Sequence, residues 1–193
     1  MTTQYLPASS LKCSGASSQL LIVDIQIQLG QAMPKKVLNR VVSNSVLLAR
    51  SATLLDVPIL HTEQYPQGLG STVAEMTEVL PDSAQLFEKT AFSCVGAAGF
   101  TDALGEPGRH QIVIAGMEAH VCVLQTALDL VANNYQVYVV EDAVCSRRLE
   151  NYQNALDRLR QSNVSIVTAE SVIFEWVVDS RHEQFKAIQT LVR

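Results

Sequence analysis

The sequence predicts an α/β fold, a three-layer α/β/α arrangement in which a six-stranded parallel sheet lies between two layers of helices. Short apolar runs recur along the chain, and they are continuous instead of alternating with polar residues. Continuous apolarity is typical of parallel strands that are covered on both faces. Between these runs, apolar residues repeat at helical spacing, and a regular alternation of strands and helices is typical of an open sheet with right-handed crossovers.

Six apolar runs predict the strands in chain order. They lie at residues 20–23, 58–60, 86–87, 112–115, 137–140 and 164–167. Apolar stripes at helical spacing predict helices around Leu38, Val41, Val42, Leu48, Ala49, Ala52 and Leu55, around Val121, Leu124, Leu128 and Val131, around Tyr152, Ala155, Leu156 and Leu159, and around Phe185, Ile188 and Val192. Asn133 and Asn134 offer a left-handed stop after the second of these stripes.

The composition indicates one globular domain. The chain has 193 residues, of which 48% are hydrophobic and 17% are charged, which is enough apolar surface for a sizeable core. Residues 1–18 are small and polar, and we expect them to form a flexible leader before a domain at 19–193. The leader lacks the basic start and apolar run of a signal peptide, and no later segment approaches membrane-spanning length, so we expect a cytoplasmic protein without a membrane partner.

The charge indicates the class of partner, and the cysteine spacing indicates the state of the thiols. The net charge is -5 and no Lys/Arg cluster is present, which disfavours nucleic acid and anionic membranes and favours a small-molecule substrate. The four cysteines are widely and irregularly spaced, at Cys13, Cys94, Cys122 and Cys145. This spacing predicts reduced thiols instead of a disulfide framework or a zinc pair.

Reactive side chains follow several of the predicted strands. In open α/β sheets the working site lies beyond the carboxyl ends of the strands. Asp24 follows the first apolar run, His61 the second and Lys89 the third, while a glycine turn after the fourth leads to Cys122. We therefore expect an acid, an amine and a thiol to meet at one edge of the sheet.

These three side chains match the requirements of a covalent hydrolase. A helix start favours a thiolate, which predicts a lowered pKa for Cys122. Asp24, after an uncharged apolar run, is suited to act as a general base, and Lys89 would stabilise both charged forms. Each residue also has an ordinary structural explanation, as a small buried thiol, a capping or loop acid, and a solvent-facing lysine.

Three sequence blocks carry a family resemblance. Residues 20–26 (LLIVDIQ), 87–93 (FEKTAFS) and 115–123 (AGMEAHVCV) resemble the signature blocks of the isochorismatase-like cysteine hydrolases, and residues 61–70 (HTEQYPQGLG) are similar to a loop of the isochorismatase-domain-containing subgroup. The resemblance implies the strand order 3-2-1-4-5-6 and a catalytic set of Asp24, Lys89 and Cys122. It also implies a cis peptide bond between Met117 and Glu118, an oxyanion hole of the backbone N–H groups of Glu118 and Cys122, and a homo-oligomer.

Other polar and aromatic residues near the blocks are candidates for the substrate pocket. They are Gln26, His61, Tyr65, Phe92 and His120, with Glu118 as a further wall. His61 could equally be a hydrogen-bonded structural histidine. A Cys-His pair of His120 with Cys122 is disfavoured because residues two apart on a helix point away from each other. Nicotinamidase-type members hold a metal through Asp-x-His and a second His, a pattern that residues 61–65 lack, so we predict no metal and no cofactor.

These observations favour hydrolysis of a small amide or related C–N bond through a thioester at Cys122. Hydrolysis of an isochorismate-type vinyl ether is an alternative within the same family. A nucleotide-binding or receiver domain is disfavoured because the sequence has no GxGxxG after the first strand, no GxxxxGK[ST] loop and no acid paired with Asp24, and a GxSxG elbow is also absent. A non-catalytic oligomeric binding module on the same fold is the third alternative.

Overall fold

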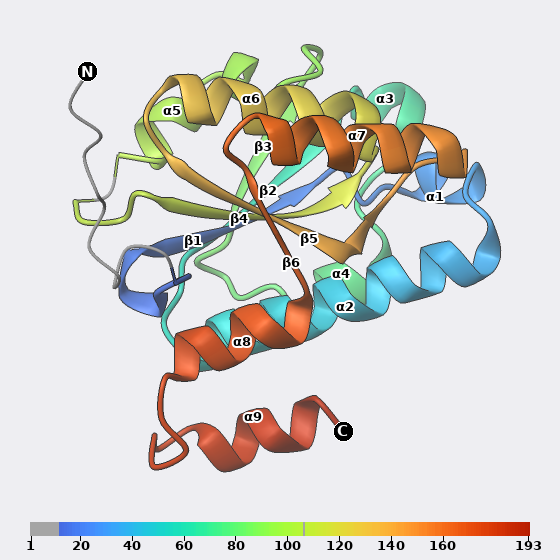
Figure 1. Ribbon diagram of the computed structural model, residues 1–193. Coiled ribbons are helices and arrows are strands. Elements are labelled where there is room, and N and C mark those ends of the chain that lie inside the picture. Colours follow the sequence, from blue (N-terminus) through green and yellow to red (C-terminus); the bar gives the residue numbers. More distant parts are fainter. Residues whose placement is uncertain (1–11, 106) are drawn as a thin grey trace.

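The computed structural model describes residues 12–105 and 107–193, which form a six-stranded parallel sheet between two layers of helices (Figure 1). The strand order is β3-β2-β1-β4-β5-β6, so the predicted fold class and the predicted order are both confirmed. The elements are η2 (Gly15–Ser17), β1 (Ser18–Val23), α1 (Ile27–Gln31), α2 (Lys35–Leu54), β2 (Ile59–Gln64), α3 (Pro66–Leu69), α4 (Ala74–Thr77), β3 (Gln85–Lys89), η3 (Cys94–Gly96), α5 (Phe100–Ala103), β4 (Gln111–Met117), η4 (Ala119–Val123), α6 (Leu124–Ala132), β5 (Gln136–Cys145), α7 (Leu149–Gln161), β6 (Ser165–Val167), α8 (Ala169–Val177) and α9 (Phe185–Leu191).

The expected leader at residues 1–18 falls partly outside the described residues. Residues 1–11 lie outside the described residues, and within 12–18 Cys13 and Ser18 are buried. Cys13 is fully buried, and its backbone N–H donates to the Glu175 carboxylate at 2.6 Å. Ser18 already belongs to β1, where it pairs with Gln111 of β4. The division of the chain into a leader and a domain at 19–193 stays a prediction.

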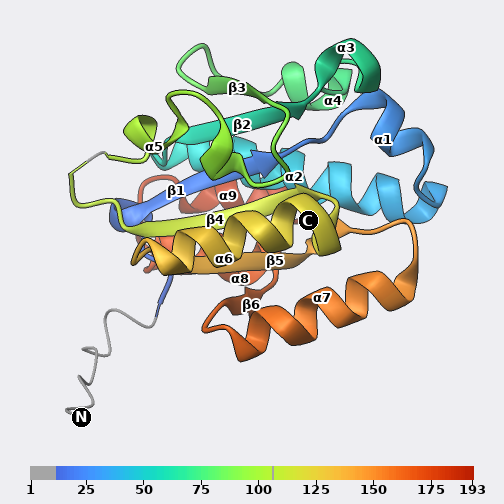
Figure 2. The same cartoon turned by 90° about the horizontal axis from the view of Figure 1, so that it is seen from above.

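The central strands are covered on both faces, as continuous apolarity predicts. Leu20 and Ile22 face a core built with α2, α8 and α9, whereas Leu21 and Val23 face a core built with α5, α6 and α7. Figure 1 shows these two helix layers below and above the sheet, and Figure 2 shows α6 and α7 side by side over β4, β5 and β6. All six residues of β1 and all seven of β4 are buried, which places the best-protected part of the sheet at the β1–β4 pair.

The carboxyl ends of β1 and β4 approach each other closely at Gly116. This residue lies opposite Val23 in the register and has φ of 124°, in a region that L side chains rarely adopt. A Cβ at position 116 would overlap the carbonyl oxygen of Val23. Glycine is therefore required where the chain leaves β4, and the close approach brings the residues after the two strands together.

The second strand is longer than the sequence predicts. It begins at Ile59 and continues to Gln64, because it pairs with β1 as far as Thr62 and with β3 as far as Gln64. His61 therefore lies inside the strand and not beyond it, which corrects the expectation that the strand ends there. No helix within the described part of the chain is long and apolar enough to cross a lipid bilayer.

Candidate active site

A buried ion pair joins two of the predicted site residues. Lys89 is the last residue of β3 and Asp24 follows β1, with β2 between them in the sheet, so the lysine side chain reaches across a strand. The Lys89 ammonium lies 2.7 Å from Asp24 Oδ2, and both side chains are 0% exposed. Removing either charge would leave the other unpaired in the interior, which is the costly outcome for buried ions.

The protein uses all the hydrogen-bond donors of the Lys89 ammonium. Besides Asp24, it donates to Gln64 Oε1 at 2.7 Å and to the carbonyl oxygen of Phe92 at 3.0 Å, with the carbonyl of Ala91 at 3.4 Å. An ammonium group has three N–H donors, and these contacts account for them. Lys89 is therefore a fixed positive charge, and its N–H groups are not free to bind a substrate.

Cys122 lies next to the same carboxylate. It is 6% exposed, and its thiol hydrogen-bonds Asp24. The predicted helix start is a π-helical turn, η4, which carries Cys122 and continues into α6. The structure thus brings Asp24, Lys89 and Cys122 together, from the ends of three strands.

The expected lowering of the Cys122 pKa is wrong for the structure as it stands, because the pKa is raised. The pKa of the thiol is raised to about 12, mainly by burial and then by the negative charge of Asp24, while the charge of Lys89 acts to lower it. Desolvation disfavours the thiolate more strongly than the helix start favours it. Cys122 is therefore a thiol at neutral pH, and any reaction through its sulfur needs a base to remove the proton.

The peptide bond between Met117 and Glu118 is cis, at the position that the resemblance implies. The carbonyl of Glu118 accepts the backbone N–H groups of Val121 at 3.1 Å and Val123 at 3.2 Å. Its buried side chain accepts two hydrogen bonds from Arg147, one from Nε at 2.9 Å and one from the backbone at 3.2 Å. The oxyanion role of the N–H groups of Glu118 and Cys122 stays a prediction.

His120 is held by the segment that follows β5. Its Nδ1 lies 2.9 Å from Ser146 Oγ, and its Nε2 lies 3.2 Å from the Asn151 side-chain nitrogen. The amide nitrogen of Asn151 can only donate, so Nε2 accepts and Nδ1 carries the proton of a neutral ring. With both ring nitrogens engaged, neither is free to serve as a base for Cys122, in agreement with the sequence argument against a Cys-His pair.

Gln26 is held by backbone groups of neighbouring segments, and its contact with a substrate stays a prediction. Its side-chain oxygen accepts the backbone N–H of Gln64 at 2.8 Å. Its amide nitrogen donates to the carbonyls of Gln64 at 3.0 Å and Gly70 at 2.6 Å. Both amide protons are thus used, and the fully buried side chain ties the end of β1 to β2 and to the loop after α3.

His61 also lies away from the candidate site. Successive side chains of a strand point to opposite faces. Thr62 and Gln64 contact Asp24 and Lys89, so His61 lies on the other face of β2. Its Nδ1 is buried without a hydrogen-bond partner, and burial lowers the pKa of the ring. A pocket role for His61 stays a prediction.

Tyr65 and Phe92 are exposed beside the ion pair. Tyr65 is 54% exposed and Phe92 is 53% exposed. A cavity of about 360 Å³ is lined by Tyr65, Pro66, Gln67, Glu88, Lys89, Thr90, Gly96, Ala97 and Ala98. Contact of Tyr65 or Phe92 with a substrate stays a prediction.

Sequence reasoning missed Thr62, Gln64 and Cys94. Thr62 Oγ1 donates to Asp24 Oδ1 at 2.6 Å, and Cys94 Sγ lies 3.8 Å from the same hydroxyl. The side-chain oxygen of Gln64 accepts a hydrogen bond from the Lys89 ammonium, and its amide nitrogen donates to the carbonyl of Thr90 at 2.8 Å. Had the second strand been extended to Gln64, the alternation of faces would have shown that Thr62 and Gln64 point to the same side.

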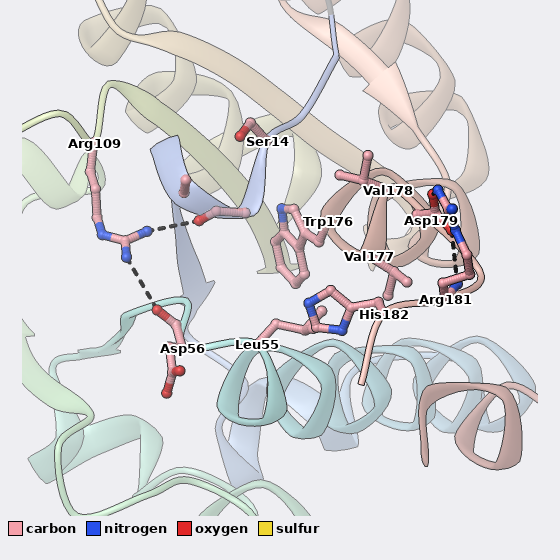
Figure 3. A pocket seen from close by; sticks show the side chains of 12 residues that line it. Ser14, Leu55, Asp56, Arg109, Trp176, Val177, Val178, Asp179, Arg181 and His182 are labelled. Atoms are coloured by element: carbon pink, nitrogen blue, oxygen red, sulfur yellow. Dashed lines mark hydrogen bonds and ion pairs between the residues drawn. The ribbon is translucent and has the colours of Figure 1, made fainter. Parts of the chain in front are cut away.

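A larger cavity, of about 730 Å³, lies at the opposite end of the sheet (Figure 3). Its lining comes from segments that precede β1, β2 and β4 and from the end of α8. Figure 3 shows the Arg109 guanidinium beside it, which donates to the carbonyls of Gly15 and Ser18 at 2.8 Å and Asp56 at 3.2 Å. None of the three reactive side chains lines this cavity, so it is not part of the candidate active site.

No metal-binding arrangement is visible around these residues. Among residues 12–105 and 107–193, no group of three or more His, Cys, Asp or Glu side chains is placed to hold a metal ion. Chemistry without a metal or cofactor stays a prediction.

Comparisons with known proteins agree with this geometry. Residues 18–171 match the family described as Isochorismatase domain. The chain is 39% identical over 181 residues to isochorismatase domain-containing protein 1 of Danio rerio, covering 93% of this chain and 62% of that protein. It spans 53% of the length of the protein of the same name from Salmo salar, so the chain covers only part of these relatives.

Two solved structures share the whole architecture. The MAR1 ribonuclease from Caenorhabditis elegans superposes with a TM-score of 0.88 at 34% identity, covering 94% of this chain and 92% of that one. The YcaC gene product from Escherichia coli, described as an octameric hydrolase of unknown specificity, superposes with a TM-score of 0.84 at 26% identity, covering 98% and 91%.

Proposed function

Because this chain belongs to the isochorismatase family, we propose that it is a cofactor-independent cysteine hydrolase that cleaves a small amide or related C–N bond. The observation that carries the proposal is the shared carboxylate. Asp24 accepts a hydrogen bond from the Lys89 ammonium and another from the Cys122 thiol, and all three residues are buried. A base in contact with a nucleophile, fixed in turn by a third group, is the arrangement that covalent catalysis requires.

In the first half of the reaction, Asp24 removes the proton of the Cys122 thiol. The thiolate attacks the substrate carbonyl carbon, a C–S bond forms, and the carbonyl oxygen becomes an oxyanion that the backbone N–H groups of Glu118 and Cys122 receive. Lys89 offsets the negative charge that moves from Asp24 to the sulfur. The C–N bond then breaks, and the leaving amine takes the proton from Asp24.

In the second half, water hydrolyses the thioester. Asp24, ionised again, removes a proton from the water, whose oxygen attacks the thioester carbonyl. The C–S bond breaks, the carboxylic acid leaves, and the proton on Asp24 returns to Cys122. Asp24 is thus used twice as a base and twice as an acid, which explains why it needs contact with the sulfur as well as with Lys89.

Three other functions compete with this one. Hydrolysis of an isochorismate-type vinyl ether would use the same fold, and a non-catalytic binding module would keep the fold without turnover. The Caenorhabditis elegans protein is described as a ribonuclease, whereas the net charge of -5 of this chain disfavours a polyanionic substrate. The contacts of Asp24 with both Lys89 and Cys122 favour an enzyme over a binding module.

We also propose that the protein is a homo-oligomer in the cytoplasm. The support for an oligomer is the likeness to the octameric YcaC hydrolase. Light scattering coupled to size-exclusion chromatography measures the mass of the assembly, and a mass of one chain, 21.1 kDa, at micromolar concentration would contradict it.

The experiment that tests the proposed function is a screen of the purified protein against small amides, with release of ammonia or acid as the readout. A vinyl ether substrate and an RNA oligonucleotide form the comparison arms. We expect turnover of at least one amide that is lost in Cys122→Ala and in Asp24→Asn. Turnover confined to the vinyl ether or to RNA, or unchanged turnover in Cys122→Ala, would overturn the proposal.

A further inference from the structure

Thr62 holds Asp24 through both its main chain and its side chain. The carbonyl oxygen of Thr62 accepts the backbone N–H of Asp24 at 3.2 Å, and its hydroxyl donates to Asp24 Oδ1 at 2.6 Å. Thr62 is 1% exposed and lies opposite Val23 in the register of β1 and β2. The hydroxyl bond is therefore buried and is set by the pairing of two central strands.

The direction of this hydrogen bond follows from the chemistry of its partners. An ionised carboxylate can only accept, so the single hydroxyl proton of Thr62 points to Asp24. Cys94 Sγ, 3.8 Å away, must then donate its S–H to the hydroxyl oxygen. Burial raises the pKa of Cys94 to about 11, in agreement with a thiol that keeps its proton. Cys94 is thus a weak donor to Thr62.

The two oxygens of Asp24 are held by two different donors. Lys89 contacts Oδ2 and Thr62 contacts Oδ1. Contacts on both oxygens restrict the rotation of the carboxylate plane more than the ammonium and the Cys122 thiol would without the Thr62 hydroxyl. A hydrogen bond to the charged form also favours that form over the protonated acid.

We propose that Thr62 is a positioning residue for the reaction, which fixes the Asp24 carboxylate toward Cys122. This role rests on the proposed function, in which ionised Asp24 is the base. Thr62 exchanges no proton with the substrate.

The test compares Thr62→Val, which removes the hydroxyl at similar volume, with Thr62→Ser, which keeps it. Thr53→Val is the matched control, because the Thr53 hydroxyl donates to Ala49 of its own helix at 3.0 Å, far from the site. We expect kcat to fall by about tenfold in Thr62→Val with KM unchanged, because the hydrogen bond that orients the base is lost. Thr62→Ser and Thr53→Val should keep the wild-type kcat and KM.

A second readout does not depend on turnover. The carboxyl ¹³C resonance of Asp24, identified by its loss in Asp24→Asn, is recorded by NMR at about pH 7, and its chemical shift should change in Thr62→Val and stay at the wild-type position in Thr62→Ser. An unchanged chemical shift in Thr62→Val and in Thr62→Ala, which guards against a misfolded valine variant, would overturn the role of Thr62. Absence of amide turnover in the wild type would instead overturn the proposed function, while the chemical shift would still decide the role of Thr62.

Discussion

Replacing Asp24 by asparagine should speed the alkylation of the Cys122 thiol and abolish the hydrolysis of the amide substrate. Burial is the main cause of the raised pKa of Cys122, and the Asp24 carboxylate adds to it through its charge and its hydrogen bond with the thiol. Asparagine removes the charge, and Lys89 continues to favour the thiolate. The thiol should therefore ionise more easily, although the base needed for hydrolysis is lost.

The size of the effect on alkylation follows from the hydrogen bond alone. A hydrogen bond to a charged group contributes about 1.5–3 kcal/mol, which corresponds to about one to two pKa units. At pH 8, well below the pKa of about 12, the thiolate fraction should rise by roughly 10- to 100-fold. A less basic thiolate is also less nucleophilic, which removes a factor of roughly 3 to 10. Iodoacetamide should then alkylate Cys122 roughly 3- to 10-fold faster in Asp24→Asn.

The assay follows alkylation at pH 8 by intact-protein mass spectrometry, with amide turnover measured on the same samples. Cys122→Ala serves as the control for alkylation of the other three thiols. These are the buried Cys13, Cys94 and Cys145, with raised pKa values of about 11, 11 and 12. Slower alkylation in Asp24→Asn would refute the inference that this carboxylate holds Cys122 as a thiol. Wild-type turnover in the variant would refute its role as the base.

Three further predictions concern stability. Lys89→Met should lower the free energy of unfolding by about 3–5 kcal/mol, because the fully buried Asp24 loses its ion pair, and urea denaturation at wild-type stability would contradict this. Gly116→Ala should cost at least about 2 kcal/mol more than Gly108→Ala in the same assay, since both glycines have positive φ but only position 116 lacks room for a Cβ. Burial lowers the pKa of His61 below 6.5 in the folded protein, so on acidification the ring is protonated in the unfolded chain before it is protonated in the folded one. The stability that His61 contributes should therefore be full above pH 6.5 and fall as the pH drops below it. His61→Gln should flatten this acid-side loss in thermal denaturation, and an unchanged slope would exclude His61 as its source.

Much of the fold could be predicted from the sequence because the parallel strands are buried on both faces. The runs at 20–23 and 112–115 lie inside β1 and β4, in which every residue is buried. The end of β2 was less visible in the sequence. Thr62 and Gln64 are polar, and only their pairing with β1 and β3 shows that they belong to a strand.

The sequence predicted which residues form the site better than it predicted their chemistry. The positions of Asp24, Lys89 and Cys122 at or after the ends of three strands are a property of the sequence pattern, and the structure places Asp24 in contact with both of the others. The ionisation of Cys122 depends on how deeply the thiol is buried and on which charges face it, and neither follows from the sequence. Likewise, Gln26 is near the site in sequence, but its amide is used up by backbone groups of β2 and the loop after α3.

The most direct test of the account is the capture of the acyl intermediate on Cys122. An amide that the protein hydrolyses is mixed with the wild-type enzyme, the reaction is quenched in acid within milliseconds to seconds, and the adduct is located by peptide mass mapping. The account predicts a mass increase equal to the acyl group on the peptide that contains Cys122, and no adduct in Cys122→Ala. An acyl group on another residue, or full hydrolysis by Cys122→Ala, would contradict it.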